Sequence, residues 1–540
     1  MMDKAIGFFL TRDPTERQPP WLHKYPWLKV HRISIKGWYI TLWGHGDLAQ
    51  FHTHSNRVVV GYSDTDLALL TVDPLQNRGA VIEIGDGGAG VRNDALGMLP
   101  VVYTASSSVP YISTCEEVII QALGKVTLDE GRLVNFLVYQ ATVLTYTLWK
   151  EIDKLYANNF LRITNEGEAK QVPQPALTFQ PVPAQDAVEH IHTVTKRVVR
   201  LYTDKLDQVI LPLSSGQDSR LILAYMQRPE RIYARSYPVS WPAHKNIEVR
   251  VAKASAAIRG VHDHTTLDFR GDFSPSTQPF IEYMGTLVSA GQVYLYAASE
   301  MMGSEHPGIP IISGVVGDVT AGRPTGFVRK WLTNPPSDLE PFKAACYCHG
   351  NEWKAEYFDP CLTFDWRSAH GPLRGSWTQC WQETEGLTPV HRAALVRLRN
   401  RCPVIITYTW AAIDIWNSMV TPYLDRDHVV SMLSLGEQAL NNRSAQQQVF
   451  AKYHSDFWQY AGIPRQELDT RNTLNLDTVT GNPRAFWPLL RDGTRPAHRF
   501  FNPEGIKALY ARAIEGHRRS WGLLASLQPI AWAVEKGYVT

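Results

Sequence analysis

A short run of small, hydroxyl-bearing residues beside an aspartate is the part of this sequence best suited to chemistry. The segment Leu211–Ser219 reads LPLSSGQDS, an apolar strand followed by a polar loop, and a helix is predicted directly after it. The small residues of the loop are Ser214, Ser215, Gly216 and Ser219. Unpaired N–H groups at a helix start, together with the helix dipole, stabilise a phosphate. Small side chains let that phosphate reach the backbone, so the pattern predicts a phosphate-binding loop.

Asp218 adds a carboxylate to this loop. It cannot bind phosphate directly, but it can hold a Mg²⁺ that does. The loop lacks the Gly-Lys-Ser/Thr end of a Walker A loop and the GxGxxG of a dinucleotide fold. Leu213, Gln217 and Arg220 complete the predicted pyrophosphate site, although Arg220 could equally lie on the solvated face of the helix. The alternative interpretation is a serine-rich turn that caps a helix.

A second loop, Ser313–Asp318, reads SGVVGD and follows another apolar stretch. We expect Gly314 and Gly317 to contact pyrophosphate, and Asp318 to face Asp218 across the switch point of a sheet. Two carboxylates that hold Mg²⁺ around a triphosphate would neutralise the pyrophosphate leaving group. The alternative for Asp318 is an ordinary turn aspartate.

The elements around these loops alternate between strand and helix, which is typical of a doubly wound parallel sheet. The predicted strands are Gln208–Leu213, Arg231–Tyr237 and His264–Asp268, and the predicted helices are Gln185–Tyr202, Arg220–Met226 and Asn246–Arg259. Adenine is expected along the strand ends, at Leu211, Ala234 and Ser236. From about Val390 onward the pattern is mostly helical, with amphipathic runs at Arg392–Arg399, Gln446–Tyr460 and Ile506–Ile514.

The first third of the chain is rich in predicted strands, and a proline-rich segment, Gln171–Pro183, separates it from the rest. The predicted strands are Trp38–Trp43, Arg57–Tyr62, Asp66–Thr71, Val81–Gly85, Pro100–Tyr103 and Val109–Ile112, and helices are predicted at Glu116–Leu123 and Asp129–Gln140. A chain of 540 residues is too long for one core, so two or more domains are expected.

Composition and charge argue against some classes of protein for this sequence. A net charge of +2 argues against a nucleic-acid binder, and no apolar run approaches the roughly 20 residues of a membrane helix. Six scattered cysteines suggest a reducing compartment, and we expect a cytoplasmic protein. Cys346, Cys348 and His349, with Cys361 and Cys380, match no familiar zinc spacing.

Several segments, in order, resemble the asparagine synthetase family (class B type) and the N-type ATP pyrophosphatases. The phosphate loop resembles SGGxDS, with Ser215 at the first glycine. The other matching segments are Gly90–Tyr103 (R-D-x-x-G-x-x-P-[LV]-Y), Ser113–Glu116 (S-S/T-E), Ser313–Asp318 (S-G-x-G-x-D, with Val316 at the second glycine) and Thr421–Asp425 (x-P-[FY]-L-D). The resemblance implies an α+β Ntn-hydrolase-like (glutaminase-like) sandwich over residues 1–175. An α/β adenine-nucleotide alpha-hydrolase-like (PP-loop) synthetase domain with a helical C-terminal part would follow over 184–540.

Three departures from the family pattern narrow the expected chemistry. The sequence begins Met1-Met2-Asp3 and its nearest cysteine is Cys115, so we expect no glutaminase activity, as in β-lactam synthetases, carbapenam synthetases and lasso-peptide cyclases. Val315 occupies the position of the tyrosine with which β-lactam-forming relatives deprotonate the amine. Glutamines occupy the place where the family has a lysine, and Lys452 or Arg443 could supply the positive charge in its stead.

The patterns and this resemblance together predict an ATP- and Mg²⁺-dependent, AMP-forming amide synthetase. It would adenylate a small-molecule or peptide carboxylate for attack by an amine, and an amine of the same substrate is the expected nucleophile. One alternative is an ammonia-dependent tailoring enzyme. The other is a non-catalytic relative that binds nucleotide or a partner protein. The sequence leaves a homodimer open.

Overall fold

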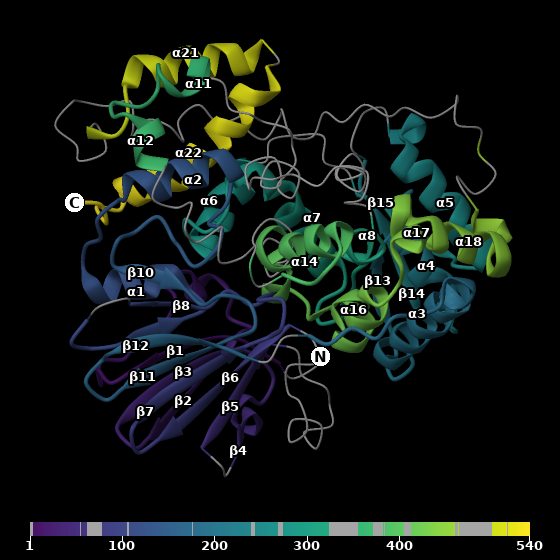
Figure 1. The fold of residues 1–540 in the computed structure, drawn as a ribbon, viewed down its shortest axis with the longest axis horizontal. Coiled ribbons are helices and arrows are strands. Elements are labelled where there is room, and N and C mark those ends of the chain that lie inside the picture. The colour runs from purple at the N-terminus through teal and green to yellow at the C-terminus, as the bar shows by residue number, and fades with distance from the viewer. Residues whose placement is uncertain are drawn as a thin grey trace.

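The computed structural model describes residues 4–53, 56–61, 78–104, 107–174, 177–238, 243–267, 274–322, 355–370, 382, 384–403, 412–458, 463, 499–515 and 517–540. These residues form a mixed α/β protein whose strands assemble into three sheets (Figure 1). The predicted strand Asp66–Thr71 and the residues Cys346, Cys348, His349 and Cys380 lie outside the described residues.

Two six-stranded antiparallel sheets make up the N-terminal part, which we call the sandwich (residues 4–173). The first sheet has the order β10-β8-β9-β1-β3-β2 and the second β12-β11-β7-β6-β5-β4. The strands are β1 (Lys4–Thr11), β2 (Lys29–Ile35), β3 (Trp38–His45), β4 (His52–Thr53), β5 (Arg57–Gly61), β6 (Gly79–Gly85), β7 (Gly88–Asn93), β8 (Val102–Thr104), β9 (Tyr111–Ser113), β10 (Ile152–Lys154), β11 (Asn159–Thr164) and β12 (Ala169–Pro173).

The inner faces of these two sheets share one hydrophobic core. Phe8, Trp38 and Leu42 come from the first sheet, and Ile82 and Val91 come from the second, all of them buried. Because successive side chains of a strand point to opposite faces, every second residue reaches this core. The two sheets therefore pack face to face as a β-sandwich.

Two helices of the sandwich, α1 (Glu116–Leu123) and α2 (Glu130–Tyr139), agree with the sequence prediction. The carboxylate of Asp129 caps α2 by accepting a hydrogen bond from Arg132 N at 2.9 Å. The last helix of the chain, α22 (Arg518–Glu535), lies beside α2 (Figure 1). Val126 N then donates to Tyr538 O at 2.9 Å, so the C-terminal end packs back onto the sandwich.

The third sheet is parallel, as the alternating pattern predicted. Its order is β15-β14-β13-β16-β17, with strands β13 (Val209–Pro212), β14 (Ile232–Ser236), β15 (Asp263–Thr266), β16 (Ile311–Ile312) and β17 (Met419–Val420). Helices α3 (Ala187–Thr203), α4 (Gln217–Tyr225) and α5 (Ile247–Arg259) accompany it on one side of the molecule (Figure 1). Strand order reverses between β13 and β16, which makes their carboxyl ends the expected place for a ligand.

The remaining helices are α6 (Ser274–Met284), α7 (Val293–Glu305), α8 (Gly317–Thr320), α11 (Ala355–Phe358), α12 (Trp366–His370), α14 (Pro389–Arg401), α16 (Arg426–Leu433), α17 (Glu437–Leu440), α18 (Ser444–Tyr453) and α21 (Pro503–Ile514), with 3-10 turns η10 (Ala412–Ile415) and η11 (Pro422–Leu424). Most of these helices lie around the sheet, whereas α11, α12 and α21 lie near α2 and α22 (Figure 1). Within the described part of the chain, no helix combines the length and apolar character required to cross a membrane.

Several predicted helix boundaries were wrong; α14 and α21, for example, each begin three residues before the predicted runs Arg392–Arg399 and Ile506–Ile514. The helix predicted over Arg220–Met226 begins three residues earlier, at Gln217, because Gly216 adopts an extended conformation (φ −62°, ψ 147°) and caps it. The helix predicted over Gln446–Tyr460 is α18, which ends at Tyr453 where His454 leaves the helical conformation.

A buried ion cluster joins the sandwich to the parallel sheet. Lys4 Nζ of β1 lies 2.6 Å from Asp414 Oδ1, and Arg78 pairs with the other carboxylate oxygen. All three side chains are at most 4% exposed. Asp414 Oδ1 also accepts a hydrogen bond from Met419 N of β17 at 2.9 Å. Burial, and then the charge of Arg78, hold the pKa of Lys4 well below its usual value. The carboxylate of Asp414 offsets the free-energy cost of burying the cationic side chains of Lys4 and Arg78.

Asp414→Asn should therefore be strongly destabilising, because it leaves two buried cations facing a neutral amide. We expect a loss of about 3–5 kcal/mol in the free energy of unfolding, measured by urea denaturation. The matched control is Asp86→Asn, which removes the exposed Lys36–Asp86 pair of similar length (2.7 Å) and should cost less than about 1 kcal/mol. If the two variants lose the same free energy of unfolding, the buried cluster does not stabilise the fold more than an exposed ion pair does.

Candidate functional site

The phosphate loop predicted from sequence connects the carboxyl end of β13 to the first turn of α4. Its serines hold its shape: Ser214 N donates to Ser219 Oγ at 3.2 Å, and Gly216 N donates to Ser214 Oγ at 3.0 Å. Ser215, which stands where the family pattern has a glycine, does not have a positive φ. The serine is therefore accommodated at this position without backbone strain.

The second predicted loop, between β16 and α8, lies directly against the first. A Cβ added to Gly314 would come within 2.9 Å of Ser219 N, and one added to Gly317 within 2.8 Å of Asp218 Cγ. Both distances are too short for any side chain. The two glycines thus allow two strand-end loops to touch, and Asp318 lies close enough that its charge raises the pKa of Asp218.

Val316, between those glycines, has a left-handed backbone (φ 67°, ψ −9°) at the start of α8. A β-branched residue in this region is a steric outlier that costs on the order of 1–3 kcal/mol. Its side chain is buried among Val319 and Leu398, which helps to compensate for the strain. The backbone at this position therefore has a conformation that suits glycine, although the residue is a valine.

Asp218 is the most heavily contacted residue of the site. Arg443 Nη2 forms an ion pair with Asp218 Oδ1, and Gln446 Nε2 donates to the same oxygen at 3.2 Å. The hydroxyl of Tyr423 donates to the backbone carbonyl oxygen of Asp218 at 2.9 Å. Burial raises the pKa of Asp218, Asp318 raises it further, and the Arg443 cation opposes both.

Arg443, and not Lys452, is the cation that the structure places at Asp218. Asn442 and Arg443 both have left-handed φ values, 49° and 62°, and form a tight turn before α18. The side chain of Arg443 is 13% exposed. The side chain of Lys452, by contrast, is 59% exposed and pairs with Glu189 at 3.4 Å. Of the two replacements that the sequence allowed for the family lysine, only Arg443 contacts the candidate site.

A cavity of about 260 Å³ opens between the two loops. It is lined by Pro212, Leu213, Ser214, Gly216, Asp218, Ser219, Tyr237, Glu248, Ser313, Gly314 and Val315. Its volume is close to the lower end of the range for small-molecule sites. It therefore has room for part of a nucleotide or for the reacting end of a substrate.

Several predicted site residues do not line this cavity. Ser215 is not a lining residue, although its N–H donates at 2.7 Å to Oε2 of Glu248, which does line the cavity. Gln217, Gly317 and Asp318 lie in the first turns of α4 and α8. Arg220 is buried and turned away: it donates to the carbonyl oxygen of Phe457 and lies over the ring of Phe450. Arg220 thus attaches α4 to the C-terminal helices.

The residues predicted to contact adenine are also placed deeper than expected. Leu211 and Ala234 are paired neighbours in the sheet and are fully buried. Ser236 Oγ donates to Leu213 O at 2.7 Å and lies in the same interior. Leu213 and Tyr237, farther along the same strands, are the residues that reach the cavity.

Sequence reasoning missed Tyr237, Glu248, Tyr423 and Gln446 as members of the site. Tyr237 directly follows β14 and Glu248 lies in the first turn of α5, so position after a strand and at a helix start was the available signal. Tyr423 lies in the matched segment Thr421–Asp425, but that motif gave it no role, and no local pattern singles out Gln446. Both residues contact Asp218, which is more than 200 positions away.

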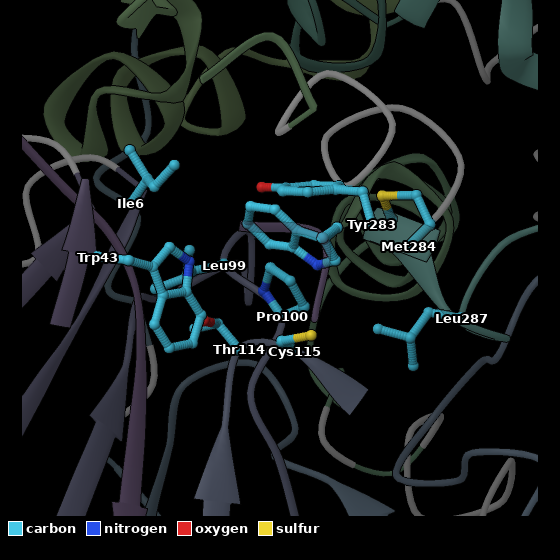
Figure 2. A pocket seen from close by; sticks show the side chains of 10 residues that line it. Ile6, Trp43, Leu99, Pro100, Thr114, Cys115, Tyr283, Met284 and Leu287 are labelled. Carbon is cyan, nitrogen blue, oxygen red and sulfur yellow. The ribbon is translucent and has the colours of Figure 1, made fainter. Parts of the chain in front are cut away.

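A second, much smaller cavity separates the sandwich from α6. Figure 2 shows Trp43, Thr114 and Cys115 on one side of it, and Tyr283 and Met284 on the other. Its volume of about 10 Å³ is close to that of a single water site, so it cannot hold a substrate. Burial raises the pKa of Cys115 to about 12, so its thiol stays protonated and weakly nucleophilic at neutral pH.

Comparisons with known proteins leave the chain without an established family. No family model matches it, and no curated protein matches it. Among solved structures, glutamine phosphoribosylpyrophosphate amidotransferase from B. subtilis, complexed with ADP and GMP, is similar at a TM-score of 0.20 and 10% identity. The match covers 60% of this chain and 79% of that chain. A likeness this weak does not establish a shared fold.

Gly317→Ala should destabilise the protein, because the new methyl group would meet Asp218 Cγ and the Tyr423 ring, each at 2.8 Å. We expect a cost of about 1–3 kcal/mol, measured as a lower midpoint of urea unfolding. Gly87→Ala is the control: nothing lies within 4 Å of the added atom, and Gly87 does not have a positive φ. If both variants unfold at the wild-type midpoint, the two loops are farther apart than described.

Proposed function

We propose that this protein is an ATP-dependent, AMP-forming amide synthetase. The observation that carries the proposal is the arrangement at the switch point of the parallel sheet, where a serine-rich loop, Asp218 and Arg443 meet beside one cavity. The motif resemblance to the asparagine synthetase family supports the same chemistry. On this proposal, residues 184–540 form the synthetase part, and residues 1–175 form a glutaminase-like part without glutaminase activity.

The proposed reaction has two steps. An oxygen of the substrate carboxylate attacks the α-phosphorus of ATP, and pyrophosphate leaves with the electrons of the broken P–O bond. An amine then attacks the acyl carbon, and AMP leaves. Adenylation is useful because a carboxylate oxygen is a poor leaving group and AMP is a good one.

The residues of the loop are suited to bind the pyrophosphate portion of ATP. The first N–H groups of α4 point out of the helix, and the hydroxyls of Ser214 and Ser219 lie 3.2 Å apart beside the same cavity. Arg443 brings a positive charge to the edge of this group. Charge stabilisation at the leaving group, rather than covalent chemistry, is what such a step requires.

Asp218 and Asp318 form a donor set that fits Mg²⁺. Both supply carboxylate oxygens, the ligands that Mg²⁺ prefers. Among the described residues, no group of three or more His, Cys, Asp or Glu side chains converges on one point. Mg²⁺ commonly takes only one or two protein carboxylates and completes its shell with phosphate and water, so two are sufficient. When bound, the ion would neutralise the charge of the leaving pyrophosphate.

The proposal predicts exchange of labelled pyrophosphate into ATP in the presence of Mg²⁺ and the correct carboxylate, sought among amino acids, N-acyl amino acids and short peptides. Asp218→Asn should lower the exchange rate at least about a hundredfold, because the metal-binding charge is lost. The control is Asp207→Asn, whose side chain is fully exposed, and it should exchange at the wild-type rate. Absence of exchange together with absence of calorimetric ATP binding would contradict the proposal and favour a non-catalytic relative.

Arg443→Gln should weaken binding of Mg²⁺–pyrophosphate at least about tenfold, measured by calorimetry, since one desolvated cation is removed. The loss should also grow as the pH falls. Without Arg443 the pKa of Asp218 rises further, so this carboxylate is protonated at higher pH than in the wild-type protein. Lys452→Gln should bind as the wild type does, because Lys452 pairs with Glu189 at the surface. If Lys452→Gln weakens binding of Mg²⁺–pyrophosphate and Arg443→Gln does not, Lys452 is the cation that binds pyrophosphate.

A further inference from the structure

The cavity contains a second carboxylate that the pyrophosphate chemistry does not use. Glu248 lies in the first turn of α5, where the side chain of Asn246 caps the helix by accepting a hydrogen bond from Glu248 N at 2.8 Å. Its Oε2 accepts a hydrogen bond from Ser215 N at 2.7 Å, and its side chain lines the cavity. Helix cap and loop together fix the carboxylate at the boundary between the phosphate loop and the rest of the cavity.

Two tyrosines stand beside this carboxylate. Tyr237 lines the cavity, and the ring centroid of Tyr294, from α7, lies 6.3 Å from that of Tyr237. Burial raises the pKa of Tyr294 to about 12, and the charge of Glu248 contributes to the shift. Burial raises the pKa of Tyr237 as well. Both phenols are therefore neutral at physiological pH and offer aromatic surface rather than a base.

The other side chains around the cavity cannot accept a proton from an amine. Val315, where β-lactam-forming relatives have a tyrosine, has no polar atom. Asp218 is engaged by Arg443 and Gln446. Of the residues that line the cavity, Glu248 and Asp218 are the two with carboxylates, and the proposed function assigns Asp218 to Mg²⁺, so Glu248 is the carboxylate left to take a proton.

We propose that Glu248, beside Tyr237, binds the amino group of the nucleophile and takes its proton, so that the nucleophile is an aliphatic primary amine. A carboxylate next to aromatic rings favours an alkylammonium ion, through charge and through cation–π contact. The ammonium transfers one proton to Glu248 and so frees its lone pair. Nitrogen then bonds to the acyl carbon, AMP leaves with the electrons of the C–O bond, and the second proton passes to solvent. This inference deepens the proposed function and rests on it.

Binding of the amine can be tested without knowing the acyl substrate. The probes are n-butylammonium and uncharged n-butanol, observed by saturation-transfer NMR with the full-length protein and Mg²⁺–AMP. We expect transfer to n-butylammonium to exceed transfer to n-butanol at least fivefold, and to fall to the n-butanol level in Glu248→Gln. The glutamine keeps a carbonyl oxygen to accept from Ser215 N. Glu504→Gln, an exposed residue of α21, should behave as the wild type. Equal transfer to both probes, or an unchanged signal in Glu248→Gln, would overturn the inference.

A kinetic readout separates this inference from the proposed function. In Glu248→Gln, amide formation with an alkylamine should fall about a hundredfold or more relative to ATP–pyrophosphate exchange by the same variant. Hydroxylamine, which is uncharged at neutral pH and needs no base, should be acylated at nearly the wild-type rate. If amine and hydroxylamine are affected equally, Glu248 is not the proton acceptor. If the wild-type protein shows no exchange at all, the proposed function itself fails.

Discussion

The close contact between the first turn of α4 and its neighbours is the constraint on which the site depends. Asp218 meets the backbone of α8 where only a glycine fits, its carbonyl oxygen accepts the Tyr423 hydroxyl, and its carboxylate meets Arg443. These three partners come from well-separated parts of the chain. A shift of any of them by an ångström would open the wall of the cavity, because packed interiors do not deform continuously. The positions of both strand-end loops follow from this contact.

The sandwich is tied to that arrangement by buried charge. Asp414, held by Lys4 and Arg78 from the sandwich, also accepts the backbone N–H of Met419, the first residue of β17. At a second point of contact, Glu116 of α1 accepts from Thr286 N and Thr286 Oγ1 at 2.8 and 2.7 Å. Separating the two parts would leave carboxylates and cations without their partners, which is costly in a low-dielectric interior. The sandwich thus holds β17, the edge strand of the parallel sheet that precedes Tyr423 in the chain. This structural role does not depend on any activity of the sandwich itself.

The electrostatics of the cavity match a substrate with two kinds of reacting group. One end has helix N–H groups and Arg443, which favour negative charge. The other end has Glu248 beside neutral tyrosines, which favours positive charge. The proposed joining of an adenylated carboxylate to an amine would use this polarity, because the two reactants carry opposite charges before they react. The hydrogen bond from Ser215 N to Glu248 links the two ends physically.

The sequence by itself determined the elements whose signals are local. An apolar strand, a run of small residues and a helix start identified β13, its loop and α4, and the alternation of strand and helix predicted the parallel sheet. The sandwich strands β3, β5, β6, β8 and β9 also followed from apolar and period-two patterns, whereas β2, β7, β10, β11 and β12 had no predicted counterpart. Even there, the start of α4 was misplaced by three residues, because it depends on the backbone conformation of Gly216 and not on residue type.

Only the tertiary structure decided which side chains share the site. The choice of Arg443 over Lys452 depends on a left-handed turn at Asn442 and Arg443. Asparagine adopts this conformation more readily than most residues, but arginine does not. Glu248 reaches Ser215 across 33 positions, and Leu213 lines the cavity although Leu211, two residues earlier, does not. Contacts between residues far apart in the chain are fixed by how helices and strands pack, which no local pattern encodes.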